Sequence, residues 1–299
     1  MKITCVTSSG KVLAENFELK GESNAVKVAD LKAAYAAKNK KSTPDRQRWK
    51  YGNKVLDRDD ATLWSYKIAD GATLEFKDLG PQISWRLVFF LEYLGPLLIY
   101  PFFYGFGHLV YGGAPVRHTL VQDIVYMMLM FHFLKREFET LFIHRFSHGT
   151  MPLSNLFKNS GHYWLLSGVL IGWHVFQQQP KGADAPSGAI VAIALWMYSF
   201  GQMANFMTHL HLRSLRPPGS TVRKIPTGFG FGLVSCPNYF FETLVWVSIL
   251  LLTQSWAVAV FTVVAVGQMY VWAVKKHKQY LKEFPKYPKE RKAMFPFIA

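Results

Sequence analysis

Long apolar stretches fill the chain from Trp85 onward, and they limit the fold more than any other feature of the sequence. A helix of a soluble domain shows a single apolar stripe, whereas these stretches are apolar on every side. A helix needs about 20 such residues to cross a bilayer. The residues before Trp85 are instead charged and mixed. We therefore expect a soluble N-terminal domain followed by a membrane domain.

Six apolar segments are candidate membrane-crossing helices, at 87–104, 120–134, 163–176, 189–207, 239–253 and 257–274. Basic residues of membrane proteins gather in the cytoplasmic loops. With a cytosolic N-terminus, six crossings place 135–162, 208–237 and 275–299 on the cytosolic side. These segments carry 16 Lys and Arg residues, against two in the opposite loops. The bias predicts a multi-pass protein with both termini in the cytosol.

The net charge of +15 would suggest a nucleic-acid partner in a soluble protein. Here it fits the cytosolic loops, which can meet anionic lipid head groups or a phosphate-rich ligand, so no nucleic acid is expected. The cysteines, Cys5 and Cys236, form no CxxC pair, which excludes a disulfide framework and a thiolate zinc site. The polar start at Met1 does not resemble a signal peptide.

The first 79 residues have the pattern of a small mixed domain. Alternating residues followed by a turn predict two strands, at 2–7 and 11–19. Apolar residues at helical spacing after Asn24 predict a helix. Further strands are expected at 47–51 and 73–76. The predicted order is two strands, a helix and then more strands.

Ionisable residues follow the second apolar segment, where 132–148 continues as a helix with positions 132, 136 and 139 on one face. Lys135 and Arg136 are either flanking charges of a span or members of a site. His144 and His148 have the i, i+4 spacing of metal ligands. Membrane di-iron enzymes carry additional boxes with adjacent histidines, which are lacking here, so we predict no metal.

Two more clusters carry candidate chemistry. Asn205, Arg213 and Arg216 lie within a few helical turns, and arginine forks suit phosphates. No GxGxxG follows a predicted strand, so a dinucleotide would have to bind through helix ends and loops. Tyr239 is either an interface aromatic or a site residue. Glu242, ionisable and close to hydrocarbon, is a functional candidate by default.

Several motifs together resemble known families. HFLKREFETLFIHRFSHGTMPLSNLFKN, GQMANFMTHLHLRSLRPPG, SCPNYFFE and KYPKERKAMFPFI resemble the steroid 5α-reductase superfamily. TPDRQRWKYGNKVLD and TLWSYKIADGATLEF resemble ubiquitin, without its terminal Gly-Gly. This start and HRFSHGTMP resemble the trans-2-enoyl-CoA reductases of the endoplasmic reticulum. The resemblance implies a β-grasp (ubiquitin-like) α+β domain at 1–79 and an α-helical polytopic membrane domain of about six transmembrane helices at 80–299.

The same resemblance implies reduction of a very-long-chain trans-2-enoyl-CoA with NADPH, the last step of fatty-acid elongation, in the endoplasmic reticulum membrane. It implies association with the ketoacyl-CoA synthase, ketoacyl-CoA reductase and hydroxyacyl-CoA dehydratase of that cycle. Tyr239 matches the catalytic tyrosine and Lys135 an important lysine, which we expect beside it. Glu92 lies where the steroid enzymes place a substrate-contacting glutamate. The positions that match cofactor-binding residues are Arg136, His144, Asn205, Arg213, Arg216, Lys224, Asn238, Glu242 and Tyr280.

Two other functions remain open at this point. A steroid or sterol reductase of the same superfamily would share the cofactor site. Phe133 and His209, where the steroid enzymes have Tyr and Asp, count against a 3-oxo-steroid substrate. A non-catalytic membrane adaptor would only present the ubiquitin-like domain, and the clustered polar residues count against it.

Overall fold

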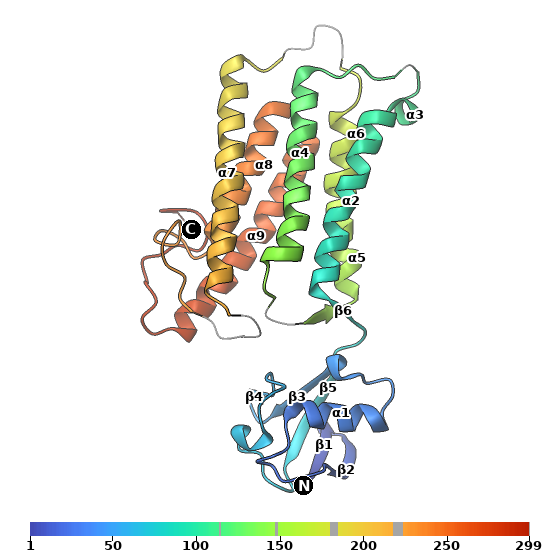
Figure 1. The fold of residues 1–299 in the computed structure, drawn as a ribbon, viewed down its shortest axis with the longest axis vertical. Helices are drawn as coiled ribbons and strands as arrows, with labels where there is room; N and C mark the ends of the chain where they lie inside the picture. Colours follow the sequence, from blue (N-terminus) through green and yellow to red (C-terminus); the bar gives the residue numbers. More distant parts are fainter. Residues whose placement is uncertain (114, 147–148, 180–184, 218–223, 299) are drawn as a thin grey trace. The chain divides into compact units, whose positions relative to one another are not determined.

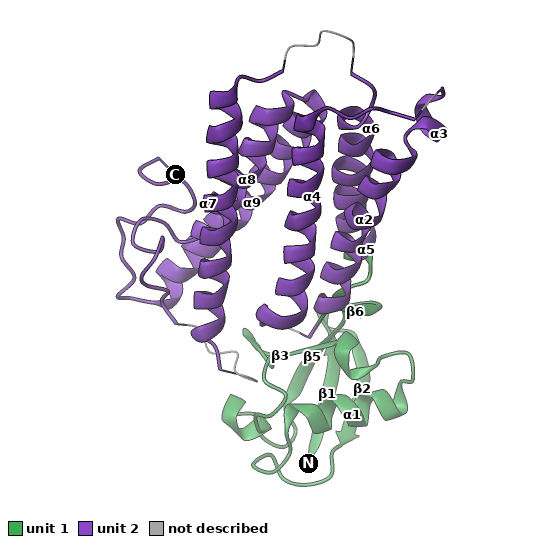
Figure 2. Ribbon diagram, turned by 45° about the horizontal axis from the view of Figure 1, so that its top comes forward, with its two compact units in different colours: residues 1–84, 150–155 green, residues 85–149, 156–299 purple. Residues whose placement is uncertain are grey.

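The computed structural model describes residues 1–113, 115–146, 149–179, 185–217 and 224–298. The chain divides into two compact units (Figure 2). Unit 1 consists of Met1–Ser84 with Thr150–Asn155, and unit 2 consists of Trp85–Gly149 with Leu156–Ala299. The residues expected to form a ubiquitin-like domain all lie in unit 1.

Unit 1 is a five-stranded sheet with the order β2-β1-β5-β3-β4 (Figure 1). Its strands are β1 (Lys2–Thr7), β2 (Val12–Glu18), β3 (Gln47–Tyr51), β4 (Lys54–Val55) and β5 (Thr73–Asp78). The central pair β1 and β5 is parallel, and the other pairs are antiparallel. Helix α1 (Val28–Lys38) lies between the first two strands and β3 in the chain. The predicted succession of two strands, a helix and further strands is confirmed.

An aromatic and aliphatic core holds this sheet to α1. Trp49 is fully buried and packs edge-on against Tyr35 of α1, with ring centroids 5.0 Å apart. Val28 and Leu31 share the buried face of the helix, as their spacing predicts.

A separate two-stranded ribbon pairs β6 (Gln82–Ser84) with β7 (Thr150–Pro152).

Unit 2 is built from helices (Figure 1). They are α2 (Trp85–Phe106), α3 (His108–Tyr111), α4 (Leu120–Phe138), α5 (Ser154–Ser160), α6 (Gly172–Val175), α7 (Gly188–Ser214), α8 (Pro237–Thr253) and α9 (Trp256–Glu283). Two π-helical segments, η3 (Glu139–Ile143) and η4 (Gly161–Ile171), extend α4 and join α5 to α6. Short 3-10 turns occur in unit 1 at η1 (Pro44–Arg46) and η2 (Leu63–Tyr66).

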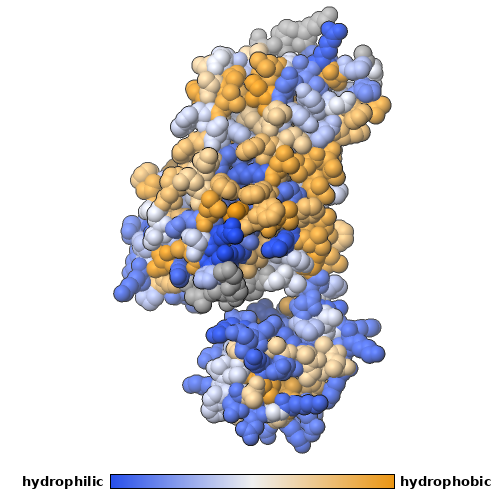
Figure 3. Space-filling view, viewed as in Figure 1, coloured by the Kyte–Doolittle hydropathy of each residue, from blue (hydrophilic) through white to orange (hydrophobic). Residues whose placement is uncertain are grey.

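Three of the described helices, α2, α7 and α9, are long and apolar enough to cross a membrane. Helix α8 is apolar but only 17 residues long. Apolar side chains cover much of the visible surface of unit 2, whereas the visible surface of unit 1 is largely polar (Figure 3). The helical region is therefore that of a membrane protein. The prediction of six crossings stays a prediction.

Close packing of α7 on α8 sets the distance between the polar residues that follow. A Cβ added to Gly201 of α7 would lie 2.9 Å from Cγ2 of Val245 and 3.0 Å from the carbonyl oxygen of Phe241. The first contact is shorter than real Cβ atoms show and the second is tighter than most, so glycine is needed for this approach. One turn later, Asn205 consequently lies against the N-terminal turns of α8.

Candidate functional site

The last turn of α4 and the π-helical segment η3 bring the carboxylate of Glu139 into contact with two cationic side chains, Lys135 and Arg136. Helix α4 starts at a capping box, in which Thr119 and Gln122 bond each other's backbone amides, and it ends with Lys135 and Arg136. The wider turn of η3 then places Glu139, fully buried, beside both. π-Helical turns within helices are frequent at functional sites.

Glu139 binds both cations through different oxygens. Nζ of Lys135 lies 2.8 Å from its Oε1, and Arg136 donates to its Oε2 at 2.6 Å. Nδ1 of His209, on α7, lies 3.1 Å from Oε1. All these side chains are at most 9% exposed, so each charge depends on its neighbours rather than on water.

Asn205 of α7 connects α4 to α8. Its carboxamide oxygen accepts hydrogen bonds from Lys135 at 2.8 Å and from Arg136 at 3.1 Å. Its amide nitrogen donates to the carbonyl oxygen of Asn238 at 2.9 Å and to Oε2 of Glu242 at 3.3 Å. Every hydrogen-bonding group of this side chain is therefore used within the site.

Glu242 closes the network from α8. Arg136 donates to one of its oxygens. The other oxygen lies 3.3 Å from Nε2 of His132 and accepts from the indole of Trp246 at 3.3 Å. The opposite ring nitrogen of His132 meets the amide of Gln202 at 3.1 Å. With Lys135 and Arg136 opposite two glutamates, the cluster is balanced in formal charge, which is the condition for burying it.

Tyr239 lies at the border of this network. Its neighbours in the chain, Asn238 and Glu242, take part in the network. Its ring packs in an apolar cluster with Cys236 and Met269. Lys135 contacts Glu139 and Asn205 rather than Tyr239, so the expected Lys135–Tyr239 contact is absent among the described residues. The catalytic role of Tyr239 stays a prediction.

Glu92, the third expected catalytic residue, lies apart from these groups. It is on α2, 1% exposed, beside Tyr93 and Asn159. Its Oε2 has no hydrogen-bond partner among the described residues. The structure shows no contact between it and Lys135.

Arg145 and Arg216 tie the segment after η3 to the end of α7. Arg216 donates to the carbonyl oxygen of Arg145 at 2.8 Å, and Arg145 donates to the carbonyl oxygens of Arg213 and Arg216. The guanidinium of Arg213 has no partner among the described residues.

The remaining expected cofactor residues are dispersed. His144 meets His209 edge to face, with ring centroids 4.9 Å apart. Burial, and then the electrostatic interaction with His209, lowers the pKa of His144 to about 3. Lys224 is exposed, and Tyr280 is buried and stacks on Tyr287 at 5.3 Å.

Glu139, His144 and His209 bring one potential metal ligand each to within 4.8 Å of one another. Both oxygens of Glu139 already face Lys135 or Arg136. A metal cation would meet these charges at the same carboxylate, so we assign no metal to this cluster. The predicted partner of His144, His148, lies outside the described residues.

Several members of the network were not predicted as site residues. They are His132, Glu139, Gln202 and Trp246. Two sequence signals point to most of them. His132 and Glu139 share a helical face with Arg136, and Gln202 and His209 flank Asn205 at spacings of three and four.

These features define the class of the protein as a helical membrane protein that joins a β-grasp unit to a buried, charge-balanced polar site. Residues 149–299 match the family described as 3-oxo-5-alpha-steroid 4-dehydrogenase, and residues 8–76 match the ubiquitin family. The chain belongs to the very-long-chain enoyl-CoA reductase family, whose members are oxidoreductases related to the steroid 4-dehydrogenase family.

Relatives in three organisms support this assignment. A Schizosaccharomyces pombe protein is 50% identical over 240 residues, which are 79% of this chain and 80% of that protein. The very-long-chain enoyl-CoA reductase of Dictyostelium discoideum is 45% identical over 80% of this chain and 78% of its own. A Caenorhabditis elegans protein, named a probable very-long-chain enoyl-CoA reductase, is 38% identical over 94% of both chains.

Proposed function

We propose that this protein reduces the Cα=Cβ bond of very-long-chain trans-2-enoyl-CoA with NADPH as the last step of fatty-acid elongation. We place it in the endoplasmic reticulum membrane, in association with the ketoacyl-CoA synthase, ketoacyl-CoA reductase and hydroxyacyl-CoA dehydratase of the cycle. The names of the Dictyostelium and Caenorhabditis relatives support the reaction. Lipid around the apolar helices suits a substrate with a long acyl chain.

The observation that carries the proposal is the network of Lys135, Arg136, Glu139, Asn205 and Glu242. It joins three helices at the border of apolar segments. Charged groups at such places are costly and are kept for function. An adaptor that only presents a ubiquitin-like unit has no need of them.

The side chains at the site suit NADPH. Arg213 offers a guanidinium that has no partner among the residues the structure describes, and its planar fork matches a phosphate. Arg216 and Lys224 add positive charge nearby in sequence. The guanidinium of Arg136 is instead occupied by Glu139 and Glu242. We therefore propose that Arg136 positions Glu242 and Asn205, and that Arg213 takes the phosphate.

The reaction needs a hydride at Cβ and a proton at Cα. NADPH, when bound, supplies the hydride, and negative charge then develops on Cα and the thioester oxygen. The hydroxyl of Tyr239 is our candidate for the donor that stabilises this charge and delivers the proton to Cα. Among the described residues this hydroxyl has no hydrogen-bond partner, which leaves it free for substrate. Asn238 and Glu242, before and after Tyr239 in the chain, fix the turn that carries it.

NADPH oxidation by the purified full-length protein tests the proposal. We expect consumption with a very-long-chain trans-2-enoyl-CoA, formation of the saturated acyl-CoA, and a fall of about 100-fold or more in turnover for Tyr239→Phe with cofactor binding retained. A 3-oxo-Δ4 steroid is the matched alternative substrate. Reduction of the steroid alone would favour the steroid reductase, and no oxidation with either substrate would favour the adaptor.

A further inference from the structure

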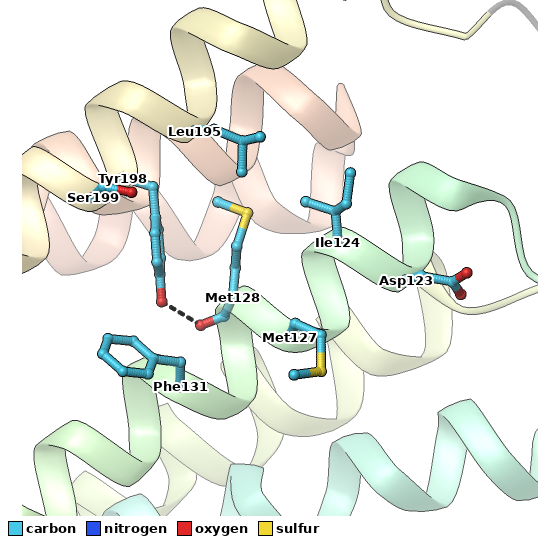
Figure 4. A pocket seen from close by; sticks show the side chains of 8 residues that line it. All are labelled: Asp123, Ile124, Met127, Met128, Phe131, Leu195, Tyr198 and Ser199. Atoms are coloured by element: carbon cyan, nitrogen blue, oxygen red, sulfur yellow. Dashed lines mark hydrogen bonds between the residues drawn. The ribbon is translucent and has the colours of Figure 1, made fainter.

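The described residues of unit 2 form at least two apolar grooves on its outside. The first, of about 450 Å³, lies between α4 and α7 (Figure 4). The second, of about 560 Å³, lies between α8 and α9. A very-long-chain acyl thioester needs an apolar groove to hold its acyl chain. The two grooves differ in how they connect to the polar site.

The first groove is closed at its floor. The hydroxyl of Tyr198 donates to the carbonyl oxygen of Met128 at 2.5 Å, and this bond spans from α7 to α4 (Figure 4). Tyr198 is 7% exposed and belongs to the helical core. A chain in this groove would be separated from the network by that bridge.

The second groove lies next to the apolar cluster against which Tyr239 packs. Thr243, one of its lining residues, donates its hydroxyl to the carbonyl oxygen of Tyr239 at 2.9 Å. Val266 and Phe295, which also line the groove, pack in the same apolar cluster as Tyr239. Tyr239 does not itself line the groove, which passes beside this shared apolar cluster and runs along α8 and α9.

The lining suits an unbranched hydrocarbon. The eight residues that line the groove are uncharged: Thr243, Val247, Thr262, Val263, Val266, Gly267, Tyr270 and Phe295. Val263 is 71% exposed, so the groove is open on its outer side. A Cβ added to Gly267 would meet nothing within 4 Å, so the absent side chain leaves open space here. A charged or bulky polar ligand would find no partner.

We propose that the α8/α9 groove holds the acyl chain of the enoyl thioester, with the reactive double bond at Tyr239 and the chain leading away along Val266, Gly267 and Val263. The inference rests on the proposed function, because it takes the occupant from the substrate of that reaction. It also makes Gly267 a determinant of acyl chain length, since a side chain there would obstruct the path without contacting the reacting atoms.

Photo-crosslinking tests where the chain lies without any need for turnover. The probe is a saturated very-long-chain acyl-CoA with a diazirine on the terminal half of its chain, added to the full-length protein in lipid nanodiscs. We expect the label on α8 and α9, at peptides that contain Val263 or Val247, and competition by the unlabelled acyl-CoA. Label on α4 and α7, around Met127 and Leu195, would overturn the proposal.

Chain-length selectivity gives a second readout. Gly267→Phe fills the groove, so we expect kcat/KM for a very-long-chain enoyl-CoA to fall on the order of 100-fold, because its double bond is misplaced. Crotonyl-CoA, which is too short to enter the groove, should lose less than about threefold by the same reasoning. Gly105→Phe is the matched control, since Gly105 is an exposed α2 glycine with equally open surroundings.

The outcomes separate the two proposals. Equal kcat/KM of Gly267→Phe and the wild type for both chain lengths overturns the groove and leaves the reductase standing. A wild type that reduces neither substrate overturns the reductase, and crosslinking then decides the groove alone. If Gly267→Phe does not fold, Val263→Phe replaces it, because Val263 is exposed at the rim.

Discussion

Arg136 of α4 and Glu242 of α8 form an ion pair across 106 residues of sequence, with the arginine side chain 8% and the glutamate side chain 12% exposed. The same guanidinium contacts Glu139 and Asn205, so it links all three helices of the site, as Asn205 also does. Its positive charge needs both carboxylates, because Lys135 shares Glu139. Removal of either glutamate leaves one positive charge without a counter-charge.

Glu242→Gln should destabilise the protein. The amide is close in size but leaves Arg136 incompletely neutralised, and the loss of one partner of a buried pair costs about 3–5 kcal/mol. We expect a clearly lower thermal unfolding midpoint in detergent. Glu290→Gln, at an exposed position of the C-terminal segment, should change stability by less than about 0.5 kcal/mol. Equal midpoints for the two variants would contradict the charge-balance account.

Arg213→Gln should weaken NADPH binding with little effect on stability. The guanidinium has no protein partner to lose among the described residues, whereas a charge-assisted bond to phosphate is worth about 1.5–3 kcal/mol, or roughly 10- to 150-fold in affinity. Titration of NADPH by tryptophan fluorescence measures the change. Lys278→Gln removes the same charge from an exposed position of α9 and should leave binding unchanged. If both variants lower the affinity for NADPH equally, the affinity depends only on net charge and the proposed contact between Arg213 and phosphate is contradicted.

His144 should make stability depend on pH. Its pKa falls from 6.5 to about 3 on folding, because burial and positively charged neighbours oppose protonation. As the pH falls, the unfolded chain therefore binds the proton before the folded chain does. The stability that neutral His144 contributes is complete above pH 6.5. It is lost as the pH falls from 6.5 toward 3. Between pH 7.5 and 5 this loss is at most about 2 kcal/mol. His144→Asn should reduce the drop in unfolding midpoint over that interval, and an unchanged drop would exclude His144 as its source.

The pattern of polar residues in the sequence included the groups that α4, α7 and α8 bring together, but it also included Glu92 of α2 and Tyr280 of α9, and it did not show how the side chains pair. Helical spacing groups Arg136 with His132 and Glu139, because all three face one direction on a regular helix. The partner of Lys135 depends on the π-helical turn at Glu139, which spacing alone does not reveal. We accordingly expected Lys135 beside Tyr239, and the structure joins it to Glu139 and Asn205.

The close approach of α7 and α8 was also beyond sequence reasoning. It depends on Gly201, a single glycine among many apolar residues, whose role is visible only when Val245 and Phe241 lie opposite. Membrane crossings are harder still to predict from sequence, because hydropathy identifies apolar stretches but does not show how deeply each one lies in the bilayer. The segment at 120–134 became α4, which ends in the charged residues Lys135 and Arg136 and is apolar over a shorter stretch than α2, α7 and α9.

Unit 1 offers a test of whether its integrity matters for catalysis. Gln47 is 3% exposed, donates to the carbonyl oxygens of Lys32 and Ser42 at 2.9 and 2.7 Å, and accepts from the indole of Trp49 at 2.9 Å. Gln47→Leu leaves these three groups unsatisfied and should destabilise unit 1 by about 3 kcal/mol or more.

Hydrogen exchange over 1–78 should then rise, with exchange in α7 and α8 unchanged. We expect wild-type turnover with enoyl-CoA, because every residue proposed to act on substrate lies in unit 2. Arg48→Gln, an exposed neighbour on β3, controls for substitution of this strand. Loss of turnover in Gln47→Leu, with Arg48→Gln unaffected, would show that the reductase depends on a folded unit 1.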